Sequence, residues 1–306
     1  MELNRMFKIW SKVYHRSKLH DLTGDPSIVL DSIRPPTPSP TTSESEAEVR
    51  ATRIKKFKSL LQMPVVPLAS LKRLAWNGIP EELRPIVWQI LLGYLPCEAS
   101  SRADVLASKR KEYQKEVKEA FQSEGGLDQA VWHQIRIDVP RTNPHLSLYS
   151  FEATQKALER ILYVWAIQHP DSGYVQGIND LVTPFFQVFL SAYIDADPET
   201  FDPGTLPAEV LESLEADSFW CLSALLDGIQ DNYIVAQPGI QRMVATLREL
   251  IARIDAPLAS HLNNEGIEFI QFSFRWMNCL LMREFTVKNV IRMWDTYAVL
   301  FPHSRY

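Results

Sequence analysis

The sequence predicts an all-α protein, and three observations support that prediction. Apolar residues recur at spacings of three and four along most of residues 71–297, for example at Leu83, Val87 and Leu91. Segments that alternate apolar and polar residues, as β-strands do, are scarce. No Asn-Gly turn lies between two such segments, so no β-hairpin is indicated. Prolines and glycines separate the periodic segments. Together with the length of 306 residues, these patterns predict a large domain of many helices.

The first fifty residues differ from the rest, and we expect most of region 1–50 to be disordered. Residues 34–48 consist largely of proline, hydroxyl and acidic residues, which cannot bury enough apolar surface to fold. Thr37 and Ser39 precede prolines, so they are either phosphorylation sites or part of an unmodified linker. Residues 3–18 predict a basic amphipathic helix, which would dock on a membrane or a partner, or pack on its own domain.

Ordered structure is expected from about Ala51, with a lead-in helix and a linker over residues 51–70. The prolines in residues 63–68 cannot continue a helix. The main domain is predicted to span residues 71–306. Its longest apolar run, Leu181–Ile194, is short for a membrane span and suits a buried helix.

Composition and missing motifs exclude several classes of function. The net charge of −5 argues against nucleic-acid binding. Cys97, Cys221 and Cys279 are far apart and fit no metal-ligand or redox spacing, so we expect a reducing, cytoplasmic setting and no metal site. The sequence has no P-loop, no His-Glu-x-x-His pair and no Gly-x-Ser-x-Gly turn. A nucleotide site of its own is therefore not expected.

One segment that carries candidate chemistry is Ile135-Arg136-Ile137-Asp138-Val139-Pro140-Arg141. Pro140 fixes one backbone angle and favours a bent presentation of Arg141, and Asp138 can brace the bend. An arginine can neutralise the charge that develops on a transferring phosphoryl group. The alternative is an ordinary surface or salt-bridge arginine.

The second such segment is Ser172-Gly173-Tyr174-Val175-Gln176-Gly177. Gly177 permits a close backbone approach beside Gln176. A glutamine can orient the water that attacks a phosphoryl group. The alternative is that Gln176 is a helix cap or a solvated side chain.

Arranged as Ile135-x-x-Asp138-x-x-Arg141 and Tyr174-x-Gln176, these two segments resemble the signature fingers of the TBC-domain Rab GTPase-activating proteins. Three further blocks resemble the family in the same order, namely residues 78–88, 274–285 and 292–297. Residues 172–186 and 231–240 resemble the branch with the fungal Golgi Ypt/Rab GTPase-activating protein and animal TBC domain family member 22.

The resemblance implies a helical domain that supplies two catalytic side chains to a GTP-loaded Rab. Arg141 would stabilise charge on the phosphoryl group, and Gln176 would position the water. Asp138, Pro140, Tyr174 and Gly177 would support these two fingers. Mg²⁺ and GTP would arrive with the Rab, so no cofactor is expected in this chain. The implied setting is vesicle transport, at the cytoplasmic face of Golgi membranes.

Several other residues belong to the family's blocks. They either contact the Rab or serve as helix caps, ion pairs and core, and they are Asn179, Asp180, Arg275, Trp276, Trp294 and Asp295. The family domain continues beyond the Trp-Asp-Thr-Tyr block, whereas residues 298–306 do not resemble that continuation. We therefore expect a domain truncated after about residue 297, with an exposed apolar face on residues 290–297. That truncation favours the alternative of a non-catalytic Rab-binding scaffold.

Overall fold

The computed structural model describes residues 42–122 and 126–300. Every regular element within these ranges is a helix, apart from one isolated antiparallel bridge between Val65 and Glu98. The all-α prediction is therefore confirmed. The expected basic helix at 3–18 and the two candidate phosphorylation sites lie outside the described residues.

The chain divides into two units, residues 1–59 and 60–306. Helix α3, Thr42–Leu61, accounts for the described part of the first unit and ends just inside the second. It begins at Thr42 rather than near Ala51, where the sequence predicts that order starts. Glutamate, alanine and arginine are strong helix formers, so the polarity of this stretch does not prevent a helix.

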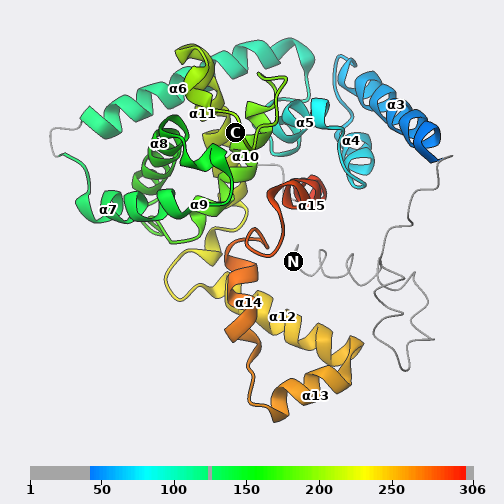
Figure 1. The fold of residues 1–306 in the computed structure, drawn as a ribbon, viewed down its shortest axis with the longest axis vertical. Helices are drawn as coiled ribbons and strands as arrows, with labels where there is room; N and C mark the ends of the chain where they lie inside the picture. Colours follow the sequence, from blue (N-terminus) through cyan, green and yellow to red (C-terminus); the bar gives the residue numbers. More distant parts are fainter. Residues whose placement is uncertain (1–41, 123–125, 301–306) are drawn as a thin grey trace. The chain divides into compact units, whose positions relative to one another are not determined.

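The second unit consists of helices joined by loops and single 3-10 turns (Figure 1). Its α-helices are α4 (Leu68–Ala75), α5 (Arg84–Leu91), α6 (Arg102–Gln122), α7 (Gln129–Asp138), α8 (Glu152–Gln168), α9 (Ile178–Leu181), α10 (Thr183–Leu190), α11 (Ala208–Asp227), α12 (Pro238–Ile254), α13 (Ala256–Asn264), α14 (Phe269–Asn278) and α15 (Val287–Leu300). The 3-10 turns are η2 (Glu81–Leu83), η3 (Ala99–Ser101), η4 (Val139–Arg141), η5 (Ser147–Ser150), η6 (Pro203–Thr205) and η7 (Gln230–Asn232).

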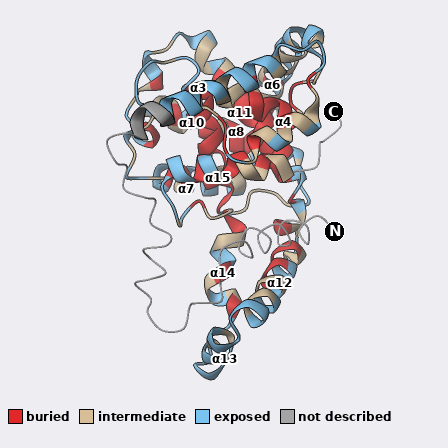
Figure 2. Cartoon of the chain, turned by 90° about the vertical axis from the view of Figure 1, so that its right-hand side faces the viewer, coloured by how far each residue is buried: buried red, intermediate tan, exposed pale blue. Residues whose placement is uncertain are grey.

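The core of the second unit lies in α8, α10 and α11. Every residue of α10 is buried, as are Ile161–Ala166 of α8 and Leu214–Leu226 of α11. A helix that is buried on all sides needs neighbours all round. α10 packs on α11, α5 and α15, while α6 and α8 pack on α11. Figure 2 shows the buried residues concentrated in these central helices.

The apolar run Leu181–Ile194 predicts one buried helix, and that prediction is wrong in its boundaries. α9 ends at Leu181, and α10 covers only Thr183–Leu190. Pro184 lies in the first turn of α10. A proline has no amide hydrogen and cannot continue the α9 ladder, but it suits the start of a helix. The same apolar run therefore folds as two helices.

The expectation that residues 290–297 expose an apolar face is also wrong. Val290 and Trp294 of α15 are buried, because α15 packs on α4, α5 and α10. Several exposed apolar side chains of this half of the unit lie instead on α12–α14, which pack mainly on one another. They include Ile254, Leu258 and Phe274.

Two buried carboxylates on α11 bind its neighbours. Glu215 pairs with Arg160 of α8 and accepts a hydrogen bond of 2.7 Å from the Tyr113 hydroxyl of α6. Asp217 pairs with Arg110, also of α6. Buried charges need such partners to offset the loss of water. These pairs fix α6 and α8 against the central helix.

A third buried carboxylate, Asp295, joins α15 to the start of the second unit. It accepts hydrogen bonds from the Ile79 amide at 2.9 Å and the Trp88 indole at 2.8 Å. Arg84 donates to both carboxylate oxygens, from Nε to Oδ1 at 3.0 Å and from Nη2 to Oδ2 at 3.3 Å. Burial raises the pKa of the Asp295 carboxyl, while Arg84 and these donors oppose that rise. Asp295, a candidate partner contact in the sequence, is thus fully enclosed by this chain.

None of the described helices is both long and apolar enough to cross a lipid bilayer.

Asp295→Ala should lower the free energy of unfolding by about 3–5 kcal/mol, because it strands the Arg84 charge and two buried donors. Urea denaturation followed by circular dichroism measures this change. Glu119→Ala is the control, since its carboxylate forms an exposed pair with Lys115, which is expected to contribute less than about 1 kcal/mol. A loss at Asp295 no larger than that of the control would contradict the assignment.

Candidate functional site

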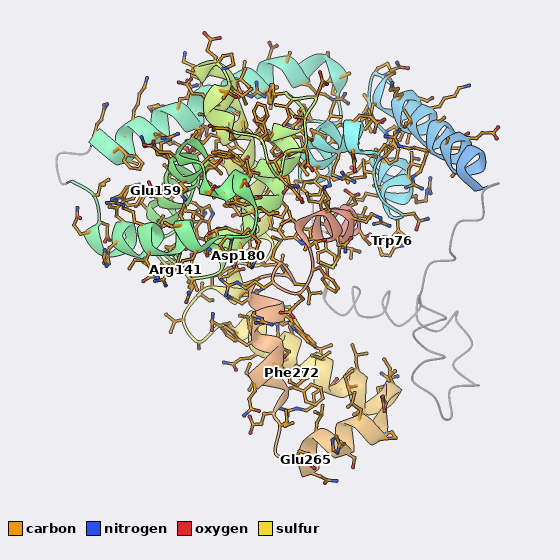
Figure 3. All side chains as sticks on the ribbon, in the orientation of Figure 1. Trp76, Arg141, Glu159, Asp180, Glu265 and Phe272 are labelled. Carbon is orange, nitrogen blue, oxygen red and sulfur yellow. The ribbon has the colours of Figure 1, made fainter. Side chains whose placement is uncertain are left out.

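Arg141 lies on a single 3-10 turn at the end of α7. Asp128 caps the start of α7 by accepting hydrogen bonds from the backbone amides of Ala130 and Val131. The helix gives way to η4 at Val139, just before Pro140, which cannot donate a backbone hydrogen bond. Val139 is buried beneath the turn, whereas the Arg141 side chain is exposed (Figure 3). The guanidinium group makes no hydrogen bond or ion pair with the described residues.

Gln176 lies in the loop between α8 and α9. This loop ends at Gly177, whose φ of 111° is a left-handed conformation that favours glycine. The Gln176 side chain is exposed and, like Arg141, makes no hydrogen bond with the described residues. Its backbone carbonyl, in contrast, accepts a hydrogen bond of 3.0 Å from Asn278 Nδ2. The backbone is held while the side chain is left available.

A buried polar ring joins the two segments, and we define it as Asp138, Thr142, Tyr174 and Asn179. The Tyr174 hydroxyl lies 3.0 Å from Asp138 Oδ2 and 3.3 Å from Asn179 Oδ1. A hydroxyl has one proton, and the nearer, charged Asp138 is the better acceptor. Asn179 Oδ1 also accepts from the Gly177 amide at 3.0 Å.

Thr142 closes the polar ring on the arginine side. Asn179 Nδ2 donates to Thr142 Oγ1 at 2.9 Å, and Thr142 Oγ1 donates to the Asp138 carbonyl at 3.0 Å. Asp138, Thr142 and Asn179 are all buried. The residues on either side of Arg141 and Gln176 are thus bonded into one unit. The sequence reasoning missed Thr142, although a hydroxyl directly after the arginine segment was a visible signal.

Tyr174 stays protonated in this setting. Burial and the negative charge of Asp138 raise the pKa of its hydroxyl far above the ordinary value of 10. The hydroxyl therefore remains a hydrogen-bond donor at neutral pH. Tyr174 thus ties the glutamine loop to Asp138 through a hydrogen bond.

Asp180 lies beside the polar ring and bonds in another direction. Its Oδ2 accepts a hydrogen bond of 2.7 Å from Arg283 Nε, and the Cys279 Sγ lies 3.7 Å away. Burial raises the pKa of the Asp180 carboxyl, and Arg283 opposes that rise. Asp180, labelled in Figure 3, is thus joined by this ion pair to the segment after α14. Arg283 lies in the block 274–285, but the sequence pattern did not identify it as a candidate site residue.

The remaining candidate residues lie outside the polar ring. Arg275 forms an exposed ion pair with Glu284 at 2.7 Å, and Trp276 packs on Phe272 with ring centroids 5.3 Å apart. Trp294 and Asp295 belong to the packing of α15. The described residues contain no cluster of His, Cys, Asp or Glu that could hold a metal ion.

The arrangement presents one cation and one carboxamide outward from a rigid base. Such a pair suits chemistry at a negatively charged reacting group with an attacking water.

Tyr174→Phe should lower the free energy of unfolding by about 1.5–3 kcal/mol, because the buried Asp138 loses a hydrogen bond to a charged acceptor. Chemical denaturation of the full chain measures this. Tyr193→Phe is the control, because its hydroxyl lies at the surface, where it accepts from Arg110 Nη2 at 3.2 Å. Equal effects of the two variants would mean that the polar ring contributes nothing specific.

Comparison with known proteins finds relatives of this chain. A family model described as Rab-GTPase-TBC domain matches residues 81–304. The chain is 60% identical over 257 residues to the GTPase-activating protein gyp1 of Schizosaccharomyces pombe, covering 83% of this chain and 50% of that protein. It is 51% identical to human TBC1 domain family member 22B, covering 80% of this chain and 49% of that one. The chain thus spans about half the length of these curated relatives.

Solved structures show the same fold. The crystal structure of the Ypt/Rab-GAP domain of Gyp1p aligns with a TM-score of 0.79 at 52% identity, covering 82% of this chain and 80% of that one. A Chlamydomonas flagellar RabGAP TBC domain aligns at 21% identity with a TM-score of 0.58, which supports the fold alone. With a family model that matches most of its length, the chain belongs to the Rab-GTPase-TBC domain family.

Proposed function

We propose that this chain is a GTPase-activating protein that accelerates GTP hydrolysis by a Rab/Ypt small GTPase. The observation that carries the proposal is the pairing of Arg141 and Gln176. Both side chains are exposed and unengaged, and the backbones beside both are fixed to the same polar ring. The relatives named as GTPase-activating proteins support the proposal.

In this mechanism the GTP-loaded Rab is the substrate and brings both the nucleotide and Mg²⁺. The Arg141 guanidinium neutralises charge that develops on the transferring phosphoryl group. Gln176 orients the attacking water with its carboxamide. An arginine supplied in this way raises the rate by about 10³–10⁵-fold, which corresponds to roughly 4–7 kcal/mol of barrier.

Binding a partner would cost little backbone conformational entropy at Arg141 and Gln176. The polar ring holds the two segments before any partner arrives, so binding has to order only the exposed parts of Arg141 and Gln176. Preorganisation of this kind is what lets charged groups stabilise a transition state efficiently.

As part of the same proposal, the reaction belongs to vesicle transport at the cytoplasmic face of Golgi membranes. Its support is the sequence resemblance of residues 172–186 and 231–240 to the Golgi branch of the family.

Arg141→Lys should reduce the acceleration by about 10²–10⁴-fold, because a lysine keeps the charge but lacks the planar fork of donors. Single-turnover phosphate release, screened over GTP-loaded Rabs, measures it. Arg136→Lys is the matched control. Arg136 is an exposed arginine of α7, and its Nε lies 4.0 Å from Glu159 Oε1, which is a long and weak ion pair. Full activity of the Arg141 variant would refute its assigned role, and binding without any acceleration by the wild type would favour the non-catalytic scaffold.

Gln176→Ala should lower the rate of hydrolysis by about 10²-fold while changing Rab affinity little, because the carboxamide acts mainly in the transition state. Affinity is measured with the Rab loaded with a non-hydrolysable GTP analogue. Gln129→Ala is the control, since this exposed glutamine bonds only within its own turn. Parallel losses of affinity and rate would make Gln176 a contact residue instead.

A further inference from the structure

The end of α14 makes a contact that the mechanism above does not use. Asn278 is the last residue of α14, and only 6% of its surface is exposed. Its Nδ2 donates a hydrogen bond of 3.0 Å to the backbone carbonyl of Gln176, more than a hundred residues earlier in the chain. The carbonyl belongs to the same residue whose side chain we propose to orient the water.

Asn278 is not explained by the stability of α14. Its Oδ1 is buried and has no hydrogen-bond partner among the described residues. A buried acceptor without a donor costs free energy, which an apolar side chain of similar size would avoid. Costly polar groups of this kind are expected where function requires them. The hydrogen bond to Gln176 is the distinctive gain that an asparagine brings here.

Asn278 is also held from two sides, once through its backbone and once through its carboxamide. The Asn278 backbone carbonyl accepts a hydrogen bond of 2.8 Å from the buried Tyr233 hydroxyl. On the other side, the Asn278 carboxamide lies so close to Gly177 that a side chain at that position would collide with it. The glutamine loop therefore packs directly against the Asn278 side chain.

We infer that Asn278 is a positioning residue, which fixes the Gln176 carbonyl so that the glutamine side chain leaves the loop in one direction. This inference rests on the proposed function. Asn278 acts through Gln176 and touches neither nucleotide nor water in this account. The polar ring holds one side of the loop through Gly177 and Tyr174, and Asn278 holds the other side.

The decisive variant is Asn278→Leu, because it removes the hydrogen bond and also removes the unpaired acceptor. With a responsive Rab as substrate, we expect kcat to fall by about 10–100-fold, since small displacements of a positioned group have effects of this size. We expect KM to change by less than about threefold and the midpoint of unfolding to stay level or rise. A purely structural asparagine would lower stability and leave the kcat of the folded protein unchanged.

Two further variants secure the test. Asn278→Asp keeps the shape but turns an acceptor toward the Gln176 carbonyl, so kcat should fall even if the leucine variant does not fold. Ser273→Ala is the matched control on α14, because its buried hydroxyl bonds only to the Phe269 carbonyl of the same helix. It should leave kcat unchanged. Wild-type kcat in a folded Asn278→Leu or Asn278→Asp variant would overturn the inference.

Amide hydrogen exchange separates this inference from the proposed function. In the folded Asn278 variants, residues 174–178 should exchange about tenfold faster than in the wild type, with or without any GTPase. If the wild type accelerates no Rab, the proposed function is refuted. Faster exchange of residues 174–178 in the variants would still show that Asn278 restrains the loop. If the wild type is active but exchange and kcat are unchanged in the variants, only the role of Asn278 is refuted.

Discussion

The hydrogen bonds of the Asn179 side chain are the interaction on which the site depends. Its carboxamide accepts from the Gly177 amide and donates to Thr142, so one residue joins the glutamine loop to the arginine turn. Asn179 can do this because it lies at the start of α9, between a left-handed glycine and the buried helix α10. A carboxamide offers a donor and an acceptor at once, which a carboxylate or a hydroxyl would not provide in the same geometry.

That constraint explains why the core of the second unit is so polar close to the site. Asp138, Asn179 and Asp180 are buried, yet each has a specific donor or acceptor nearby. Burying these groups without partners would cost several kcal/mol in total. The apolar centre in α8, α10 and α11 supplies the stability that allows such groups to be buried at the edge. The two carboxylates of α11, paired with Arg160 and Arg110, follow the same rule farther from the site.

The sequence was sufficient to predict the helical fold and the two segments that carry Arg141 and Gln176. Helical periodicity is a local property, and the proline and glycine beside the two side chains mark bends directly. The polar ring was only partly predictable. Asp138 and Tyr174 were named as support, but the sequence did not indicate that they bond to each other, because they are 36 positions apart.

Other features depended on tertiary contacts that no local pattern contains. From the sequence, Asp295 was a candidate contact with a partner protein. The structure instead shows it bonded to Arg84 and Trp88 of this chain. The break between α9 and α10 was the opposite case, since Pro184 was a local signal that the length of the apolar run concealed. Asn278 could not be found from its own surroundings in the sequence, because its partner is Gln176.

The division between fixed backbone and free side chain has a consequence for how the site works. Ordering a long side chain costs up to about 2 kcal/mol, whereas ordering a loop costs about 1–2 kcal/mol for every residue. A site that met its partner with two unfixed loops would lose much of its binding energy to that ordering. Here the polar ring and Asn278 have already fixed the backbone on both sides of Gly177. The energy gained from binding the proposed GTPase partner would therefore be available for placing the Arg141 and Gln176 side chains, which are the parts that the proposed chemistry requires.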